Sequence, residues 1–139
     1  MTYENPWIYN GLIFDSENIE DHVGYIYLIE NLTNNRKYVG KKLFTSSRTK
    51  VVKKKKKKVR VESDWKKYYG SNVELIADVD KLGPQNFRRT ILRLCKTKGE
   101  CNYFEAKEQF SLDVLRSEEY YNTWIMVKVH KSHVIKSKD

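Results

Sequence analysis

The segment from Gly24 to Gly40, which reads GYIYLIENLTNNRKYVG, constrains the fold of this chain more strongly than any other. Two runs of apolar and aromatic residues flank a polar, asparagine-rich turn at residues 31–36. In the first run Tyr25 and Tyr27 alternate with apolar residues, so both tyrosines fall on one face of a strand. Alternating runs on either side of such a turn predict a β-hairpin.

The rest of the chain predicts a mixed α/β protein. Residues 7–14 indicate a short packing segment with no chemistry in it. Apolar residues recur at helical spacing over residues 73–82 and 100–115, which predicts two helices. Residues 87–94, FRRTILRL, predict a third strand, and MVKVH at 126–130 predicts a short last one.

Positive charge is concentrated in one segment. The chain has 27 Lys and Arg against 18 Asp and Glu, and residues 41–67 hold 13 basic and 2 acidic side chains. Six consecutive lysines repel one another, so residues 49–62 are expected to form a mobile, lysine-rich loop or an irregular ribbon. A local basic patch is typical of a polyanion site, whereas a loop that only keeps the protein soluble is the simpler alternative.

Nothing in the sequence indicates a membrane-bound or secreted protein. The longest apolar run is too short to cross a bilayer, and the N-terminal residues lack the pattern of a signal peptide. Cys95 and Cys101 are the two cysteines, and we expect them to be reduced thiols. They have no companions at zinc-ligand spacing, so they are assigned no metal. The expected compartment is a cytoplasm.

Glu105 and Glu108 fall on a largely apolar stripe of the helix predicted at residues 100–115. The same stripe contains Cys101, Phe104, Leu112 and Leu115. A carboxylate directed at the protein body needs a partner or a metal. An ion pair with an arginine of the 87–94 strand is the simpler of these two interpretations.

Two tyrosine motifs and their spacing resemble the GIY-YIG nuclease family. The first motif reads YIY, ends at Tyr27 and has Gly24 one position early. The second reads YVG, from Tyr38 to Gly40. An arginine, Arg48, and a helix that carries a glutamate follow in the order of the family.

The resemblance covers roughly residues 23–125, taken as the core of one domain that spans residues 1–139. It implies a small three-stranded antiparallel sheet flanked by helices, an α/β fold of the α+β kind, in agreement with the predicted elements. The segment WKKYYGS at 65–71 looks like one in small phage-encoded members, including the phage endonuclease II group. The resemblance therefore implies a phage protein that acts in a bacterial cytoplasm.

The family implies hydrolysis of DNA phosphodiester bonds at a single Mg²⁺ or Mn²⁺ ion. Such cleavage needs an activated water, a cation on the scissile phosphate and positive charge where the transition state gains negative charge. A carboxylate on a helix is a suitable ligand for Mg²⁺, which prefers oxygen and retains waters. The resemblance assigns this role to Glu105, with Glu108, one turn away, as the runner-up.

By the same resemblance, Tyr27 and Tyr38 would direct two hydroxyls at one point and orient or deprotonate the attacking water. An unperturbed phenol, with a pKa of about 10, is a poor base at neutral pH. Nearby cations or the metal would have to lower that pKa. Taken alone, tyrosines in a hairpin are usually packing residues.

Further residues receive roles from the resemblance and from their charge. Arg48 would bind the phosphate through its guanidinium fork, and Lys66 or Lys67 would supply a second cation. Asn122 would support the site through hydrogen bonds, although a turn residue is the simpler interpretation. The basic residues expected to contact nucleic acid are Lys41, Lys42, Lys53, Lys54, Lys55, Lys56, Lys57, Lys58, Arg60 and Lys67. The glycines expected to be structural parts of the motifs are Gly40 and Gly70.

Three functions are open from the sequence. The first is a metal-dependent DNA endonuclease, and the second is a catalytically inactive nucleic-acid-binding module on the same fold. The third is an unrelated basic domain that binds RNA or protein. A histidine-metal nuclease is disfavoured because His22, His130 and His133 are scattered. A double-strand break would need a second copy of the chain or two sequential nicks, so a homo-oligomer on DNA is one expectation.

Overall fold

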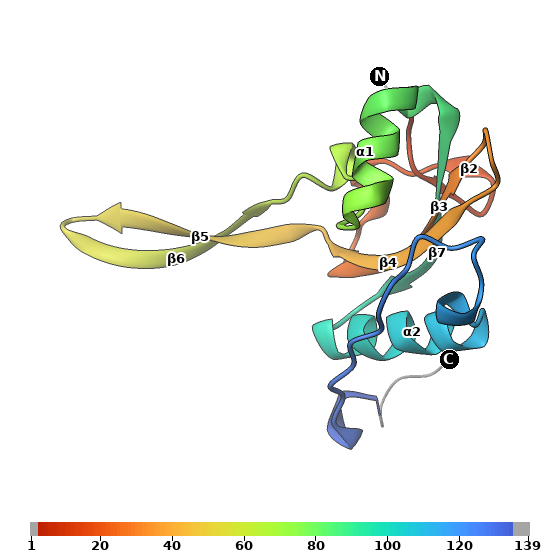
Figure 1. The fold of residues 1–139 in the computed structure, drawn as a ribbon. Coiled ribbons are helices and arrows are strands. Elements are labelled where there is room, and N and C mark those ends of the chain that lie inside the picture. Colours follow the sequence, from red (N-terminus) through yellow and green to blue (C-terminus); the bar gives the residue numbers. More distant parts are fainter. Residues whose placement is uncertain (1–2, 135–139) are drawn as a thin grey trace.

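The computed structural model describes residues 3–134, which form a five-stranded sheet, a separate two-stranded hairpin and two α-helices (Figure 1). The strands are β1 (Ile8–Tyr9), β2 (Leu12–Ile13), β3 (Gly24–Asn31), β4 (Lys37–Leu43), β5 (Thr45–Val52), β6 (Lys55–Glu62) and β7 (Phe87–Cys95). The helices are α1 (Val73–Leu82) and α2 (Lys98–Ser111). No helix in residues 3–134 is long and apolar enough to cross a membrane.

The large sheet has the strand order β2-β1-β7-β3-β4. Its centre is the predicted antiparallel trio, in which β3 pairs with β4 on one side and with β7 on the other. The expected total of three strands is wrong, because β1 and β2 form a small hairpin that joins β7 through a parallel pairing of Ile8 with Thr90. Positive φ angles of 52° at Asn10 and 79° at Gly11 allow this tight turn.

The two helices cover opposite faces of the sheet. On one face, Tyr25 and Tyr27 join Trp7, Trp65 and Leu75 of α1 in a buried aromatic cluster. On the other face, a second cluster joins the sheet to α2 and consists of Ile26, Val39, Cys95, Cys101, Phe104 and Val114. Alternation along β3 therefore places the two tyrosines together on the α1 side, as the sequence predicts.

Side-chain caps fix the starts of both helices. The Asn72 side-chain oxygen accepts from the Leu75 amide at 2.9 Å, and the Thr97 hydroxyl accepts from the Glu100 amide at 3.0 Å. Helix α2 ends at Ser111, four residues earlier than predicted. Residues 126–130 form no strand, so that expectation is also wrong.

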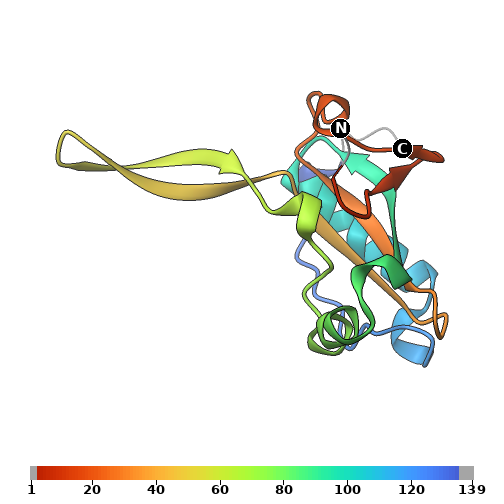
Figure 2. The ribbon, with the colours of Figure 1, turned by 90° about the horizontal axis from the view of Figure 1, so that it is seen from above.

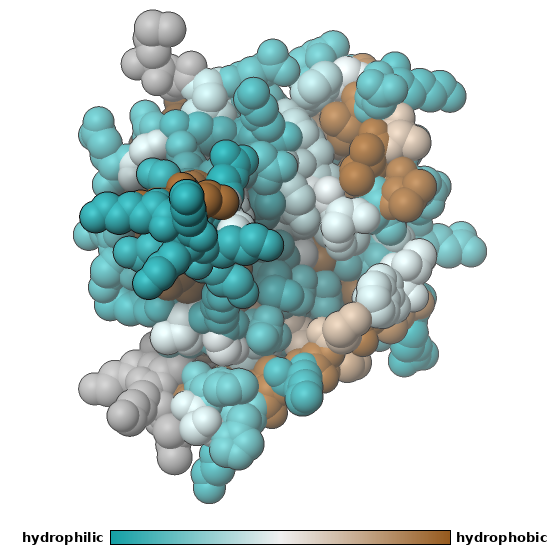
Figure 3. Space-filling view, turned by 90° about the vertical axis from the view of Figure 1, so that its left-hand side faces the viewer, coloured by the Kyte–Doolittle hydropathy of each residue, from teal (hydrophilic) through white to brown (hydrophobic). Residues whose placement is uncertain are grey.

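The lysine-rich segment is a regular antiparallel hairpin, not the expected loop or irregular ribbon. Strands β5 and β6 pair over their full length, from Thr45 opposite Glu62 to Val52 opposite Lys55. The hairpin projects from the body of the protein in both ribbon views (Figures 1 and 2). Seen from its end, it presents mainly hydrophilic side chains (Figure 3). The lysines alternate between its two faces, which spreads their charge, and β-branched valines favour the extended backbone.

The outer edge of β4 is covered by residues 119–122. The Lys37 amide donates to the Glu119 carbonyl at 2.7 Å, and the Tyr121 amide donates to the Lys37 carbonyl at 2.7 Å. The Asn72 amide group also donates to the Tyr121 carbonyl at 2.9 Å. An exposed edge strand is thereby closed to other chains.

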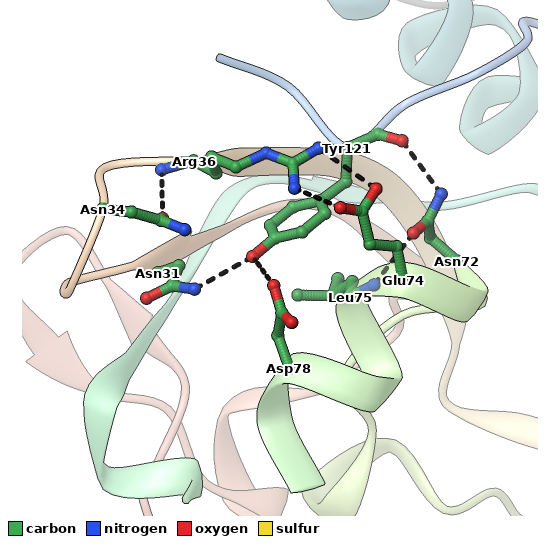
Figure 4. Close-up of polar contacts among 8 residues, drawn as sticks. All are labelled: Asn31, Asn34, Arg36, Asn72, Glu74, Leu75, Asp78 and Tyr121. Atoms are coloured by element: carbon green, nitrogen blue, oxygen red, sulfur yellow. Dashed lines mark hydrogen bonds and ion pairs between the residues drawn. The ribbon is translucent and has the colours of Figure 1, made fainter. Parts of the chain in front are cut away.

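Polar contacts around Tyr121 fix this cover (Figure 4). The Tyr121 hydroxyl donates to Asp78 of α1 at 2.7 Å and accepts from the Asn31 amide at 2.9 Å. The Arg36 guanidinium lies 4.0 Å from the centre of the Tyr121 ring and pairs with Glu74. The β3–β4 turn, α1 and the edge cover are thus joined in one cluster.

Arg89 of β7 is buried, with 1% of its surface exposed, and its charge is met by main-chain carbonyl groups. Its nitrogens donate to the carbonyl oxygens of Glu4, Asn5, Lys66 and Tyr68. The guanidinium also lies over the rings of Trp7 and Tyr69, at 4.7 and 4.3 Å from their centres. One side chain therefore joins the N-terminal residues, the central sheet and the segment after the basic hairpin.

We expect Arg89→Met to lower the free energy of unfolding by about 3 kcal/mol or more, because buried carbonyl oxygens lose their donors. Arg89→Lys should restore little, because an ammonium cannot reproduce the planar fork. Urea denaturation measures both effects.

The matched control is Arg88→Met on the same strand, since Arg88 is exposed and pairs with Glu30 at 3.1 Å. A surface pair of this kind contributes about 0–1 kcal/mol. Equal losses in the Arg88 and Arg89 variants would contradict the role given to Arg89.

Candidate active site

Two adjoining hollows form a groove between β4, α2 and the base of the β5–β6 hairpin. Their volumes are about 490 Å³ beside the hairpin and about 290 Å³ beside the C-terminal segment. Lys41, Ser71 and Glu105 line both hollows. This groove is where the structure gathers most of the chemistry that the sequence predicts.

Glu105 projects from α2 into the groove. Its side chain is 15% exposed, and its carboxylate lies 3.3 Å from the Lys41 ammonium of β4. The ion-pair partner of Glu105 is thus a lysine of β4 and not an arginine of β7. Burial raises the pKa of the Glu105 carboxyl above its usual range, and Lys41 offsets part of that rise. Burial therefore disfavours the charged form of Glu105, and a neighbouring cation favours it.

The arginines of β7 contact groups other than Glu105. Arg88 pairs with Glu30, Arg89 bonds to main-chain carbonyls, and the Arg93 guanidinium lies 3.9 Å from the centre of the Phe104 ring. Glu108 lines a different hollow, together with Arg93 and Phe104. The structure therefore places Glu105, and not Glu108, beside the tyrosine motifs.

Tyr27 and Tyr38 lie close together, with ring centres 6.1 Å apart, but their settings differ. Tyr27 is buried at 1% exposure, and the Tyr68 ring packs edge-on against it at 5.9 Å. Tyr38 lines the groove, and its hydroxyl lies 3.2 Å from the Ser71 hydroxyl. Tyr38 can thus meet a substrate directly, whereas Tyr27 supports it from behind.

Both phenols have raised pKa values. Burial is the main cause for Tyr27, and the neighbouring phenols of Tyr68 and Tyr38 add to it. Burial also raises the pKa of Tyr38, against a hydrogen bond with Ser71 that lowers it. The surrounding groups of the protein therefore favour the neutral form of both phenols. A catalytic base would instead need a lowered pKa.

The two motif glycines allow close approach to the tyrosines. A Cβ atom on Gly40 would lie 2.5 Å from the Tyr27 hydroxyl oxygen. Gly70 has a φ of 90°, and its Cβ would lie 3.3 Å from the Tyr38 ring and 3.1 Å from Leu75. Any side chain at position 40 would displace the Tyr27 hydroxyl.

Asn122 holds the second tyrosine motif by its main chain. Its side-chain oxygen accepts from the Val39 amide at 3.1 Å, and its nitrogen donates to the Val39 carbonyl at 2.8 Å. Gln109 of α2 donates to the same carbonyl at 2.9 Å. Asn122 therefore lies where it can position Tyr38 and Gly40 on either side of Val39.

The basic residues divide between the groove and other surfaces. Lys41, Lys42 and Arg60 line the groove. Lys42 pairs with Asp64 at 2.6 Å and lies 4.0 Å from the centre of the Tyr68 ring. Arg60 donates to the Thr45 carbonyl at 2.9 Å.

Three predicted cations lie outside this set. Arg48 is exposed on β5, opposite Val59, and does not line the groove. The Lys66 ammonium lies 5.6 Å from the centre of the Trp65 ring, and Lys67 lines a separate hollow beside α1. The structure gathers Arg60, rather than Arg48, with Tyr68 and Glu105.

Sequence reasoning missed Tyr68, Ser71 and Gln109, which line the groove or fix its walls. The segment YYGS at 68–71 was the available signal, since it follows the basic stretch and precedes a helix cap. Gln109 gave no signal beyond its place on α2.

A divalent metal would rest on a single carboxylate here. Residues 3–134 contain no group of three or more His, Cys, Asp or Glu side chains able to hold a metal. Mg²⁺ is often bound by one or two carboxylates, with waters and substrate phosphate completing its shell. The groove-facing Glu105 carboxylate, with its raised pKa, fits that arrangement.

Comparison with known protein families places most of the chain in one family model. Residues 7–125 match the family model described as "Putative endonuclease segE, GIY-YIG domain". No curated protein and no solved structure matches the chain at a significant level.

We expect Glu105→Gln to stabilise the protein at neutral pH. A carboxyl whose pKa is raised in the folded state binds protons more tightly there, so it costs stability once it ionises. The gain in unfolding free energy should be absent below the usual pKa of 4.5 and appear as pH rises through the folded value. Thermal or urea unfolding between acid and neutral pH measures it.

Glu108→Gln is the matched control, because it removes one carboxylate from the same helix. Burial of Glu105 would be shown not to destabilise the protein by either of two results: an equal gain in unfolding free energy in the two variants at neutral pH, or a loss of unfolding free energy in Glu105→Gln.

Proposed function

This chain belongs to the GIY-YIG family, and we propose that it is a DNA endonuclease that hydrolyses phosphodiester bonds at a single Mg²⁺ or Mn²⁺ ion. The family indicates a nuclease function. The observation that carries the finer proposal is the groove itself. Glu105, Tyr38 and Lys41 line one hollow of the groove, and Glu105 and Lys41 also line the adjoining hollow at the base of the strongly basic hairpin.

Glu105 would hold the metal, which supplies a Lewis acid for the scissile phosphate and lowers the pKa of bound water. The remaining roles fall to groups of the chain. Lys41, Lys42 and Arg60 would bind the phosphate and offset the charge that grows in the transition state.

Tyr38 would orient the attacking water while it keeps its own proton. Its hydroxyl can accept a hydrogen bond from the water and direct its proton toward Ser71, 3.2 Å away. Tyr27 and Gly40 would fix the Tyr38 ring from behind, and Asn122 would fix the strand. This assignment replaces deprotonation by the phenols with orientation, because burial raises their pKa values.

The β5–β6 hairpin would grip the DNA backbone. It carries Arg48 and Lys50 on β5, Lys53 and Lys54 in the turn, and four lysines at positions 55–58 of β6, and every one of these side chains is exposed to solvent. The turn residues Lys53 and Lys54 have positive φ angles of 50° and 64°, which costs roughly 1–2 kcal/mol each for residues other than glycine. Lysine at these two positions therefore contributes positive charge to the tip of the hairpin and does not favour the turn by its backbone preference.

We expect wild-type protein with Mg²⁺ to convert supercoiled plasmid to nicked circles before linear DNA, since one groove meets one strand at a time. Glu105→Gln should reduce cleavage by about 10²-fold or more, and Tyr38→Phe by roughly 10²-fold. Glu108→Gln should cut nearly as well as wild type. Gel analysis of cleavage rates provides the measurement.

Cleavage that is unaffected by Glu105→Gln, or lost equally in Glu108→Gln, would refute the assignment of the metal ligand. Salt-sensitive DNA binding without any cleavage would identify the chain as an inactive binding module.

We expect Lys56→Ala/Lys57→Ala to weaken DNA binding and to reduce the slope of log affinity against log salt by about 1–2, since each phosphate contact contributes about 0.9. Lys81→Ala/Lys96→Ala removes the same charge from α1 and the turn after β7, outside the groove and the hairpin. Fluorescence anisotropy with labelled duplex at several salt concentrations, in EDTA, compares the two. Equal salt slopes for the two double variants would show that the hairpin does not bind the DNA phosphates.

A further inference from the structure

The C-terminal end of the groove has an apolar wall that the proposed chemistry does not use. Trp124 and Met126 line it together with Lys128, opposite Glu105 and Tyr38. The two apolar side chains are 65% and 67% exposed. Trp7 and Trp65, in contrast, are fully buried, so Trp124 is the accessible indole of the chain.

Trp124 is exposed on a backbone that is anchored on both sides. Two residues before it, Asn122 is bonded to both main-chain groups of Val39. Directly after it, Ile125 packs against the buried cluster between the sheet and α2. Residues 124, 126 and 128 line the groove, whereas Ile125 between them packs on that cluster. The indole is thus presented to the groove by a fixed support.

The surroundings fit a nucleotide better than an apolar partner. Trp124 and Met126 supply one flat apolar wall, whereas Asn102, Gln109 and Lys41 make the remaining lining polar. Aromatic side chains bind bases of any sequence through their π faces, and lysines beside them bind the connecting phosphates. Apolar side chains such as methionine can also separate adjacent base pairs when they enter a duplex.

We propose that Trp124, with Met126 beside it, is a stacking platform for one unpaired DNA base next to the scissile phosphate. This inference rests on the proposed function, because the platform lies in the same groove as Glu105. Bases in a duplex are already stacked, so the target nucleotide would have to be extruded or lie in an opened strand. Substrates with a bulged or single-stranded base at the cut site would be favoured for that reason.

Tryptophan fluorescence tests the platform without cleavage. The probes are a short oligodeoxythymidylate, a duplex with one bulged thymine and the same duplex fully paired, each in EDTA. We expect the first two to quench the emission and to protect it from iodide, since Trp124 is the accessible indole. Trp124→Phe should show neither change.

Affinity for the bulged duplex gives a second readout. Trp124→Ala should weaken binding about 5- to 150-fold, and Trp124→Phe should recover part of that loss. Leu12→Ala is the matched control, because Leu12 is an equally prominent apolar side chain, 73% exposed, at the opposite edge of the sheet. It should bind as wild type does.

The inference is overturned if Trp124 stays open to iodide in the saturated complex, or if Trp124→Ala binds like Leu12→Ala. It is also overturned if Trp124→Ala alters sedimentation but not DNA affinity, since the patch would then be a protein contact. If Trp124→Ala still cleaves DNA and binds it with unchanged affinity, the stacking platform is refuted and the proposed nuclease activity stands. If DNA quenches the emission but the wild type cleaves nothing, the stacking platform is supported and the nuclease activity is refuted.

Discussion

Arg89 carries a charge into the interior of the protein, where burial lowers the pKa of its guanidinium and main-chain carbonyl groups supply its hydrogen bonds. Those carbonyls belong to two segments that are also joined by buried tryptophans, since the Trp7 indole donates to the Trp65 carbonyl at 2.7 Å. The N-terminal residues and residues 66–68 form no long strand or helix, yet both meet at this guanidinium. Tyr68 is one of these residues: its carbonyl accepts from Arg89, and its ring packs against Tyr27. The position of the tyrosines beside the groove thus depends on a buried ion that holds Tyr68 by its main chain.

Strand β4 serves as both a sheet edge and a wall of the groove. Its outward main-chain groups at Val39 are bonded to Asn122 and Gln109, so the edge is closed without a further strand. Tyr38 and Lys41 of the same strand line the groove. The Glu105 carboxyl beside this strand lowers the stability of the fold, because it is buried, has a raised pKa and is paired with a lysine. Such local cost is expected where a protein keeps a charge ready for a ligand.

Local patterns in the sequence predicted what local forces decide. The β3–β4 hairpin, α1, α2 and β7 follow from periodicity, caps and turn residues, and the structure confirms them. Strands β1 and β2 have two residues each, which is too short for alternation to be recognised, so the sheet was predicted with three strands. The basic segment was predicted as a loop because like charges repel, but backbone pairing over eight residues in each strand outweighs that repulsion.

The site was less predictable, because it depends on side-chain direction. Glu105 and Glu108 share a stripe in the sequence, and a rotation of part of one turn sends them to different hollows. Arg48 and Arg60 belong to adjacent pairs of the hairpin, but Arg60 and its partner Ser47 line the groove, whereas Arg48 does not. Trp124 lies two residues beyond a predicted site residue, and only the anchoring of Asn122 and Ile125 shows which way it faces. Tertiary contacts, rather than local pattern, therefore decide which charged and aromatic side chains form one groove.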